Sequence, residues 1–249
     1  MTGASAFEEV AELAAIGITA YTTTRELGSL GVATDEPVRD VMGRWNHVRT
    51  VLAEHGVYRL ATASQVHEAR VITHEGTWQG WLRASNADGH ASAAAPRTAL
   101  AVTIADCVPI FLAHPSGAVA LLHSGWRGTA ARIVEQGIGA LSALGCPADE
   151  LVLHLGPAIC GRCYEVGADV ASRLLGRPVT APTAVDLRAV IADHASALGV
   201  RRISVSRWCT RCDNVRFFSH RAGDAGRQIA VIASGREGMQ GLAGGVQST

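Results

Sequence analysis

A cysteine and a histidine beside apolar runs in the middle of the chain are the residues whose types best suit chemistry. Cys107 lies between two apolar runs, 98–105 and 108–113, which we interpret as buried strands. His123 follows a third expected strand at 118–122, just before a glycine-flanked turn into a helix. Because the ends of neighbouring strands meet in space, this thiol and imidazole can form a metal site or a reactive Cys/His pair. For either residue alone, packing in the core is the more common role.

A second histidine extends this pair to a candidate metal site. His67 comes shortly after the expected strand 57–63, so His67, Cys107 and His123 all lie at predicted strand ends. Two imidazoles and one thiolate suit Zn²⁺, and three protein ligands leave a fourth position for water or substrate. A catalytic zinc needs such a position to generate hydroxide at neutral pH. The spacings of 40 and 16 residues form no local motif, so the prediction depends on the strand ends.

Copper chemistry is less compatible with the sequence. A blue-copper site combines two histidines and one cysteine with a nearby axial methionine, and the chain has only Met1, Met42 and Met239. The ten histidines form no His-x-His pair, which argues against a trinuclear copper cluster. Zinc is therefore the expected cofactor, with copper able to displace it because copper binds most nitrogen and sulfur sites more tightly.

Two Cys-x-x-Cys pairs form a second candidate metal site. Cys160 and Cys163 make the first pair, Cys209 and Cys212 the second, and four cysteines can form a closed structural zinc site. The 45 residues between the pairs exceed the spacing of typical zinc ribbons, which favours reduced packing or loop thiols. A thioredoxin-like redox role lacks the expected βαβ context.

Arginine and aspartate side chains near these positions are candidates for binding an anion and moving a proton. Arg127 lies in a Gly-Trp-Arg-Gly sequence that opens a predicted helix, where backbone amides and a guanidinium can hold a phosphate. Arg221 and Arg227 are further candidates, and a salt bridge or packing on tryptophan is the alternative for all three. Asp106, next to Cys107, is a candidate general acid/base, and turn capping is its alternative role.

The composition predicts a globular protein and excludes several enzyme classes. Of the 249 residues, 48% are hydrophobic and 18% are charged, and the formal net charge is zero, so we expect no nucleic-acid and no membrane partner. All 22 basic residues are arginine, which excludes a Schiff-base lysine, a pyridoxal phosphate anchor and a P-loop lysine. Glu8, Glu9 and Glu12 indicate an amphipathic N-terminal helix instead of a signal peptide. We therefore expect a cytoplasmic protein with reduced cysteines.

The order of the expected elements predicts an α+β fold. Helices are expected at 5–16, 129–144, 167–175 and 186–198, together with one capped by Asp35 that ends near Gly56, and strands at 17–24, 57–63, 69–73, 98–105, 108–113, 118–122, 150–155, 202–206 and 228–233. The segment 74–97 is rich in turn residues. Strands and helices are mixed without strict alternation, which favours α+β layers over a doubly wound parallel sheet. We expect a single domain over residues 1–249, with a flexible tail from about residue 238.

Several sequence motifs in the chain resemble those of one known family. They are Gln65-Val-His67, Asn86-Ala-Asp88-Gly89, Thr103-Ile-Ala-Asp-Cys-Val-Pro109, His123-Ser-Gly-Trp-Arg-Gly-Thr129, Gly156-Pro-Ala-Ile159 with Cys163-Tyr-Glu-Val166, Trp208-Cys-Thr210, Phe217-Phe-Ser-His-Arg221 and Gly226-Arg-Gln228. The Ala-Asp-Cys and His-x-Gly-Trp-Arg-Gly stretches, in that order, are the most specific. The chain resembles the laccase-domain family of zinc-dependent purine nucleoside enzymes, also called multicopper polyphenol oxidoreductases or peptidoglycan editing factors.

The resemblance implies a fold, a metal site and two reactions. The implied fold is a single α/β/β/α-layered domain. The implied reactions are phosphorolysis of adenosine, inosine and methylthioadenosine to the free base and ribose 1-phosphate, and hydrolytic deamination of adenosine. A purine nucleoside and phosphate are thus the expected partners. The candidate site residues are the zinc ligands and catalytic residues His67, Cys107 and His123, the acid/base candidate Asp106, and the substrate-binding residues Gln65, Arg127 and Arg221.

The chain differs from the family pattern at two places. Ser29-Leu30-Gly31 and Thr34-Asp35 replace an Asn-Leu-Gly stretch and a following Gly-Asp step, and Asn46-His47 replaces an Asn-Arg step. If that arginine binds phosphate in the family, His47 favours deamination over phosphorolysis, or the use of another substrate.

Two other functions are compatible with the same residues. In a metal-free hydrolase, Cys107 activated by His123 would attack an amide, but such a pair has no need of His67. A non-catalytic zinc protein that binds a nucleotide or a cell-wall precursor is favoured by the replaced Asn-Arg step and disfavoured by the retained Gly-Trp-Arg-Gly and Phe-Ser-His-Arg stretches. The sequence leaves the oligomeric state open. The zinc-dependent nucleoside enzyme is the function that the sequence favours.

Overall fold

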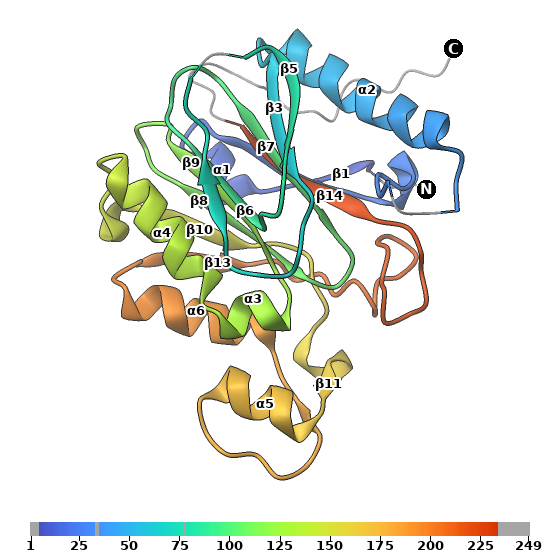
Figure 1. The fold of residues 1–249 in the computed structure, drawn as a ribbon, viewed down its shortest axis with the longest axis vertical. Coiled ribbons are helices and arrows are strands. Elements are labelled where there is room, and N and C mark those ends of the chain that lie inside the picture. The colour runs from blue at the N-terminus through green and yellow to red at the C-terminus, as the bar shows by residue number, and fades with distance from the viewer. Residues whose placement is uncertain (1–4, 33–34, 77, 234–249) are drawn as a thin grey trace.

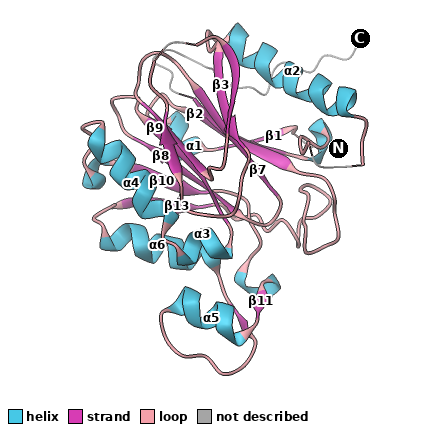
Figure 2. Cartoon of the chain, viewed as in Figure 1, coloured by secondary structure: helices cyan, strands magenta, loops and turns pink. Residues whose placement is uncertain are grey.

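Two six-stranded mixed sheets lie face to face, and helices cover their outer faces (Figures 1 and 2). The computed structural model describes residues 5–32, 35–76 and 78–233. Helix α2 (Val38–Glu54) packs on the first sheet, and α3 (Trp126–Ala130), α4 (Ile133–Ala143) and α6 (Leu187–Ala197) lie against the second. This arrangement confirms the predicted α+β fold with its α/β/β/α layers. Within the described ranges, no helix combines the length and the apolar character needed to cross a membrane.

Both sheets contain parallel and antiparallel strand pairs. The first sheet has the order β1 (Phe7–Glu9), β2 (Thr19–Thr23), β14 (Gln228–Ala233), β7 (Ala99–Ile104), β3 (Arg59–Ala63) and β5 (Gly80–Ala84). The second has the order β13 (Arg202–Val205), β10 (Val152–Leu155), β8 (Val108–Ala113), β9 (Val119–Ser124), β6 (Gly89–Ser92) and β4 (Val71–Thr73). The chain crosses from the first sheet to the second between β7 and β8, which is where Asp106 and Cys107 lie.

Alternating side chains of the central strands supply the cores. In β7, Leu100, Val102 and Ile104 lie in the core between the sheets, while Ala99 and Ala101 face α2. This alternation follows from the period of two in a strand. Each large aliphatic side chain buried in this way contributes about 1.5–3 kcal/mol, so the facing sheets hold the strand ends firmly. The residues at those ends are thereby fixed relative to one another.

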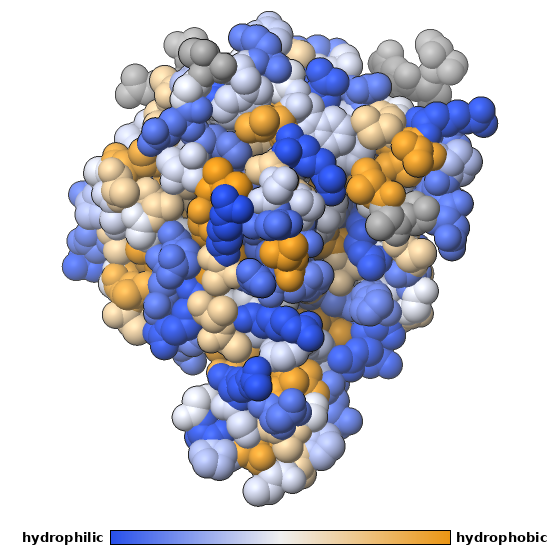
Figure 3. All heavy atoms as spheres, viewed as in Figure 1, coloured by the Kyte–Doolittle hydropathy of each residue, from blue (hydrophilic) through white to orange (hydrophobic). Residues whose placement is uncertain are grey.

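A smaller part of the chain extends from these layers. It contains α5 (Ala168–Leu175) and a short antiparallel pair of strands, β11 (Glu165–Val166) and β12 (Thr183–Ala184). Figure 1 shows α5 and β11 at the lower end of the molecule. On the face drawn in Figure 3, hydrophobic and hydrophilic side chains are interspersed over this extension and over the layers above it.

The N-terminal prediction of a helix over 5–16 is wrong. The segment forms β1 and only a short helix, α1 (Ala11–Ala14). Strand β1 pairs antiparallel with β2, and Phe7 packs edge-on against Tyr21 with ring centroids 5.0 Å apart. Sheet pairing thus outweighs the helical pattern of this stretch. Helix α2 also differs from prediction, because Pro37 occupies its N-cap position and Asp35 does not cap it.

Three further predictions need correction. The turn-rich segment 74–97 contains two strands, β5 and β6. The predicted helix 129–144 is divided into α3 and α4 by Arg132, whose backbone adopts the left-handed conformation with φ 59°. His123 lies inside β9, one residue before its end, and does not follow it. The predicted flexible tail from about residue 238 falls outside the described residues.

Candidate functional site

The side chains of His67, Cys107 and His123 converge, although they are far apart in the sequence. Each offers one ligand atom, and the three atoms lie within 4.8 Å of one another. The rings of His67 and His123 meet edge to face, with centroids 4.9 Å apart and planes at 82°. His67 follows β3, Cys107 lies between β7 and β8, and His123 is near the end of β9. Strand ends from both sheets therefore bring the three predicted ligands together.

An unusual backbone and a glycine allow this close approach. His67 and Asp106 have φ angles of 61° and 83°, a region that few non-glycine residues adopt and that is frequent at functional sites. Gly125 lies against the ligands, because a Cβ at this position would be 2.9 Å from the Sγ atom of Cys107 and 3.5 Å from Cδ2 of His67. Only a residue without a side chain fits beside these atoms.

The buried carboxylate of Asp88 positions both histidines. Its Oδ1 atom accepts hydrogen bonds from Nδ1 of His123 and from the backbone N–H of His67, both at 2.9 Å. Its Oδ2 atom accepts from the amides of Val66 at 3.1 Å and Glu68 at 3.0 Å. Burial raises the pKa of Asp88, but these hydrogen bonds outweigh burial and lower it. With Nδ1 engaged, His123 has Nε2 free for a metal, which is the usual arrangement of a metal-binding histidine.

Cys107 and His123 shift one another's pKa in opposite directions. Burial raises the pKa of the Cys107 thiol, but His123 and His67 more than offset it and bring the pKa to about 6. Burial lowers the pKa of His123, whereas Cys107 and Asp88 raise it to about 9. Without a metal, the pairing therefore favours the thiolate and the imidazolium over the neutral thiol and imidazole. The thiolate is the form of cysteine that binds metal ions.

The donor set fits a zinc ion. Two imidazoles and one thiolate are common zinc ligands, and a carboxylate that orients one imidazole is the usual second partner. The described residues supply three such donors at this point. A zinc held by three protein ligands keeps a position for substrate, which is the mark of a catalytic site over a structural one.

Gln65 fastens the loop that carries His67 to β7. Its side-chain N–H donates to the carbonyl of Thr103 at 2.9 Å, and its Oε1 accepts from the amide and the hydroxyl of Thr103, both at 2.8 Å. The same side chain lines a cavity next to the metal ligands. Its predicted contact with substrate stays a prediction.

A cavity of about 450 Å³ is lined in part by all three ligands. Its wall includes Trp45 and Trp81, whose rings stack with centroids 4.7 Å apart, together with Leu30. The indole N–H of Trp45 donates to the carbonyl of Leu30 at 2.8 Å, and that of Trp81 to the hydroxyl of Thr62 at 2.7 Å. With the polar atoms of both indoles engaged, their rings give the cavity an apolar wall, in which Trp81 is the more accessible ring because Trp45 is buried.

A second cavity of about 270 Å³ is lined by His67, Cys107 and two arginines. The guanidinium of Arg127 lies over the ring of Trp126 at 4.4 Å, and that of Arg221 over the ring of Tyr164 at 5.1 Å. Arg221 also donates to the carbonyl of Glu165. Packing on aromatic rings, the alternative weighed for Arg127, is therefore present, and it leaves both guanidinium groups in the cavity wall.

The two cavities share part of their walls. His67, Ala105, Cys107 and His220 line both of them. A ligand in either cavity can thus reach the same donor atoms.

Both carboxylate oxygens of Asp106 are engaged in hydrogen bonds. Oδ1 accepts from the hydroxyl of Thr210 at 2.6 Å, and Oδ2 accepts from the backbone N–H of Arg221 at 2.7 Å. These contacts make Asp106 a positioning residue for the segment that carries Arg221. Its predicted part in proton transfer stays a prediction.

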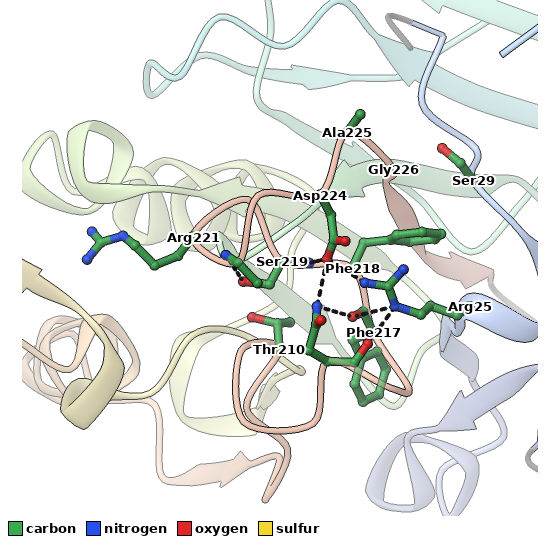
Figure 4. Close-up of polar contacts among 12 residues, drawn as sticks. Arg25, Ser29, Thr210, Phe217, Phe218, Ser219, Arg221, Asp224, Ala225 and Gly226 are labelled. Atoms are coloured by element: carbon green, nitrogen blue, oxygen red, sulfur yellow. Dashed lines mark hydrogen bonds and ion pairs between the residues drawn. The ribbon is translucent and has the colours of Figure 1, made fainter. Parts of the chain in front are cut away.

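The turn that carries His220 and Arg221 is held by a half-buried ion pair. The carboxylate of Asp224 binds Arg25 and also accepts from the side-chain amide of Asn214 at 2.6 Å and the backbone amide of Ser219 at 2.8 Å. In Figure 4, Arg25 and Ser219 lie beside Asp224, while the side chain of Arg221 points away from this cluster. The cluster therefore fixes the turn and leaves Arg221 directed elsewhere, into the wall of the second cavity.

Some residues of the site were not singled out from the sequence. Asp88 and His220 lie in two of the quoted motifs, and membership of those motifs was the available signal. The aromatic residues Tyr164 and Trp81 carried no chemical signal of their own. Among the predicted residues, Arg227 lines the first cavity and donates to carbonyls of the preceding turn, at distances of 2.8 to 3.2 Å.

His47, which stands where the family pattern has an arginine, is not among the described residues that line the two cavities. It is exposed on α2, and within the described part of the chain it lines neither of them. The difference from the family pattern at this position therefore removes no residue from either wall.

Comparison with known proteins identifies the family of the chain. The family model described as multi-copper polyphenol oxidoreductase laccase matches residues 24–235. A purine nucleoside phosphorylase of Deinococcus radiodurans is 35% identical over 197 residues, which are 74% of this chain and 74% of that protein. A purine nucleoside phosphorylase of Pseudomonas aeruginosa is 32% identical over 216 residues, covering 82% of this chain and 84% of that one.

A deaminase and a solved structure extend the comparison. Adenosine deaminase RL5, from an unknown prokaryotic organism, is 35% identical over 136 residues, which are 49% of this chain and 52% of that protein. The crystal structure of YlmD from Geobacillus stearothermophilus superposes on this chain with a TM-score of 0.80 at 27% identity. The superposition covers 94% of this chain and 100% of YlmD. Because the family model spans most of the residues that build both sheets and the three converging ligands, the chain belongs to the multi-copper polyphenol oxidoreductase laccase family.

Proposed function

We propose that the chain is a zinc-dependent purine nucleoside phosphorylase that also deaminates adenosine. The observation that carries this proposal is that His67 and Cys107, two of the three predicted zinc ligands, line both a large aromatic cavity and a smaller one with two arginines. A nucleoside and an anion can meet there at the same donor atoms. Relatives named purine nucleoside phosphorylase and adenosine deaminase support the two reactions.

The metal would be held by His67, Cys107 and His123, with Asp88 orienting His123. When bound, zinc supplies a Lewis acid that stabilises negative charge as it develops on the reacting atoms. Copper competes for such ligands by the usual affinity order, so a copper-loaded preparation would not contradict the assignment.

The larger cavity is the proposed nucleoside site. Its volume of about 450 Å³ lies within the range of roughly 300–1,000 Å³ that is usual for small-molecule sites. The apolar wall formed by Trp45 and Trp81 suits contact with a flat purine base. Phosphorolysis breaks the bond between C1′ and N9, whereas deamination replaces the amino group on C6. Because one set of ligands serves both reactions, the nucleoside would bind in two orientations.

The smaller cavity is the proposed phosphate site. Arg127 and Arg221 are its cationic side chains, and guanidinium groups bind phosphate oxygens in pairs. In phosphorolysis a phosphate oxygen bonds to C1′ as the base leaves, and the base must take up a proton. We assign that proton to His220, whose imidazole lines both cavities.

Product analysis by liquid chromatography and mass spectrometry tests the proposal. Protein of known zinc content is incubated with adenosine, with and without phosphate. The expected products are adenine and ribose 1-phosphate only when phosphate is present, and inosine in both cases. No product from a zinc-loaded sample would overturn the assignment and favour a non-catalytic zinc protein.

A variant and its matched control distinguish the roles of the two cavities. Arg127→Gln is expected to raise the KM for phosphate by about tenfold or more, because it removes a charge-assisted phosphate contact worth about 1.5–3 kcal/mol, and to leave deamination near the wild-type rate. Arg177→Gln, which changes an exposed arginine outside both cavity walls, serves as the matched control. Equal loss of both reactions in Arg127→Gln would contradict a dedicated phosphate site.

The thiolate of Cys107 favours one competing function, a metal-free Cys/His hydrolase acting on an amide. In that case iodoacetamide would inactivate the protein and removal of zinc would not. For a zinc enzyme we expect that a chelator removes the activity and that added Zn²⁺ restores it.

A further inference from the structure

Two Cys-x-x-Cys pairs that the proposed reactions do not use lie close together near the smaller cavity. Cys160 and Cys163 belong to the turn after β10, and Cys209 and Cys212 follow β13. The four sulfur atoms all lie within 4.8 Å of one another. A parallel bridge between Ala158 and Cys209 joins the two segments beside them. The two pairs are therefore close in space although 45 residues separate them in the sequence, and the argument from spacing for unconnected thiols no longer holds.

The separations between the sulfur atoms suit one shared metal ion. A tetrahedral zinc with bonds of about 2.3 Å to sulfur holds its ligand atoms about 3.8 Å apart. The Sγ atoms of Cys163 and Cys212 lie 3.4 Å apart, and the whole set stays within 4.8 Å. A disulfide needs about 2.05 Å and joins only two sulfurs. Four mutually close thiols are the donor set of a closed metal site.

The surroundings of Cys209 favour negatively charged sulfur, whereas the hydrogen bond with Cys163 raises the pKa of Cys212 as long as no metal replaces the protons. The backbone amides of Cys160 and Cys212 both donate to the Sγ atom of the buried Cys209, at 3.3 and 3.4 Å. Hydrogen bonds of this kind stabilise a thiolate over a thiol. A zinc ion bound by four thiolates carries a net charge of −2, and each pair contains an arginine, Arg162 or Arg211, that offsets this charge.

We propose that Cys160, Cys163, Cys209 and Cys212 bind a structural zinc ion, separate from the ion of the candidate active site. Four protein ligands complete the tetrahedral coordination, so this ion has no position for a substrate. It would cross-link the segment after β10 to the segment after β13. This proposal does not depend on the proposed reactions.

The cross-link would support one wall of the smaller cavity. Thr210, which follows Cys209, donates its hydroxyl to Asp106 at 2.6 Å, and the amide of Ile159 donates to the carbonyl of Asp106 at 3.0 Å. Ile159 and Tyr164 flank the first cysteine pair in the sequence, and both line that cavity. The zinc therefore ties together the segments that hold Asp106 and the second cavity.

Counting metal ions on the 249-residue chain tests the inference. Native mass spectrometry and elemental analysis of protein prepared with zinc should show two ions per wild-type chain. The double variant Cys163→Ser/Cys212→Ser should retain one ion, His123→Ala should retain one, and the triple variant none. Cys146→Ala changes the cysteine that belongs to neither cluster and should keep two ions.

A measurement on the wild-type protein covers the case in which the cysteine variants fail to fold. With Co²⁺ in place of zinc, sulfur-to-cobalt charge-transfer absorption grows with the number of thiolate ligands. The protein should show the strong near-ultraviolet band of four thiolates, which persists in His123→Ala.

Three results would overturn the inference. One is a single zinc per wild-type chain that disappears in His123→Ala. Another is a mass spectrum in which the four cysteines form disulfides in protein prepared without oxidant. The third is iron in place of zinc after growth with both metals.

Discussion

At the scale of single residues, the site depends on a carboxylate that touches no substrate in our proposal. Asp88 is fully buried and accepts four hydrogen bonds, one from the imidazole of His123 and three from the amides of 66–68. It therefore sets both the ring orientation of one ligand and the backbone position of another. Residues of this kind tune metal affinity almost as strongly as the ligands do.

Asp88→Asn should weaken zinc binding at the candidate active site by about 10–100-fold, because a neutral amide orients His123 less firmly and cannot accept all four hydrogen bonds. Competition with a chelator of known affinity measures this change. Glu68→Gln is the matched control, since Asp88 binds the amide of Glu68 and not its exposed side chain. Equal zinc affinity in Asp88→Asn and wild type would contradict the role assigned to the carboxylate.

The candidate metal ligands are the part of the site that was easiest to predict from the sequence. His67, Cys107 and His123 followed from ligand type and strand ends, and the structure brings their ligand atoms together. Asp88 could not be found in this way, because an aspartate in a turn sequence is usually a capping residue. The four-cysteine cluster was considered as a metal site but not favoured, because spacing along the chain says little about whether two distant loops meet.

At the scale of elements, the junction between β9 and α3 has no room for a side chain. Gly125 joins the strand that carries His123 to the helix that carries Arg127, so both cavities depend on its position. A Cβ there would contact the thiol of Cys107 at 2.9 Å, closer than such atoms approach. The junction, the thiol or the whole β7–β8 turn would have to move.

Gly125→Ala should therefore reduce activity by about 100-fold, which is the order of loss expected for a displacement of about 1 Å at reacting groups. Steady-state rates and the zinc content at the active site report this change. Gly139→Ala in α4 is the control, because a Cβ there would meet no described atom within 4 Å. In a helix this exchange should stabilise the protein by about 0.5–1 kcal/mol.

Secondary structure was predicted correctly where hydrophobic runs were long. The prediction failed where a short segment forms a strand only because it pairs with a neighbouring strand. The runs that became β7, β8 and β14 are buried on both faces, and their apolar composition predicted them directly. β5 is short, with partly exposed residues, and pairs in parallel with β3, so its turn-like sequence gave little signal. Phe7–Glu9 forms a strand because β2 offers an edge to pair with.

At the scale of the whole molecule, two buried histidines make the fold sensitive to acid. His74 and His90 share a hydrogen bond of 2.8 Å between Nε2 and Nδ1. Burial, with the charge of Arg59, lowers the pKa of His74 to about 4, and burial with His74 lowers that of His90 to about 3, against an opposing effect of Asp88. Both rings are therefore neutral in the folded protein at neutral pH.

The sign of the pH dependence follows from these values. An unfolded histidine takes up a proton near pH 6.5, whereas the folded pair does so only near pH 4 and below. Stability should be complete above pH 6.5 and should fall progressively between pH 6.5 and about 3, by on the order of 5 kcal/mol for the two histidines together at pH 4.5. Chemical denaturation of the metal-free protein from pH 7.5 to 4.5 measures this loss without any contribution from metal release.

A double variant isolates the histidine pair. His74→Leu/His90→Leu should flatten the pH dependence, whereas His47→Gln, which changes an exposed histidine on α2, should retain it. An unchanged slope in the double variant would assign the acid sensitivity to other groups.

The wall shared by the two cavities has a consequence for the order of events in catalysis. Nucleoside and phosphate occupy separate compartments in our proposal, so neither must leave before the other enters. Phosphorolysis should then proceed through a ternary complex with both substrates bound at once. Initial rates measured over a grid of both concentrations should give intersecting lines in double-reciprocal plots. Parallel lines would indicate that the sugar is first transferred to the protein, a chemistry that needs a covalent nucleophile at the junction.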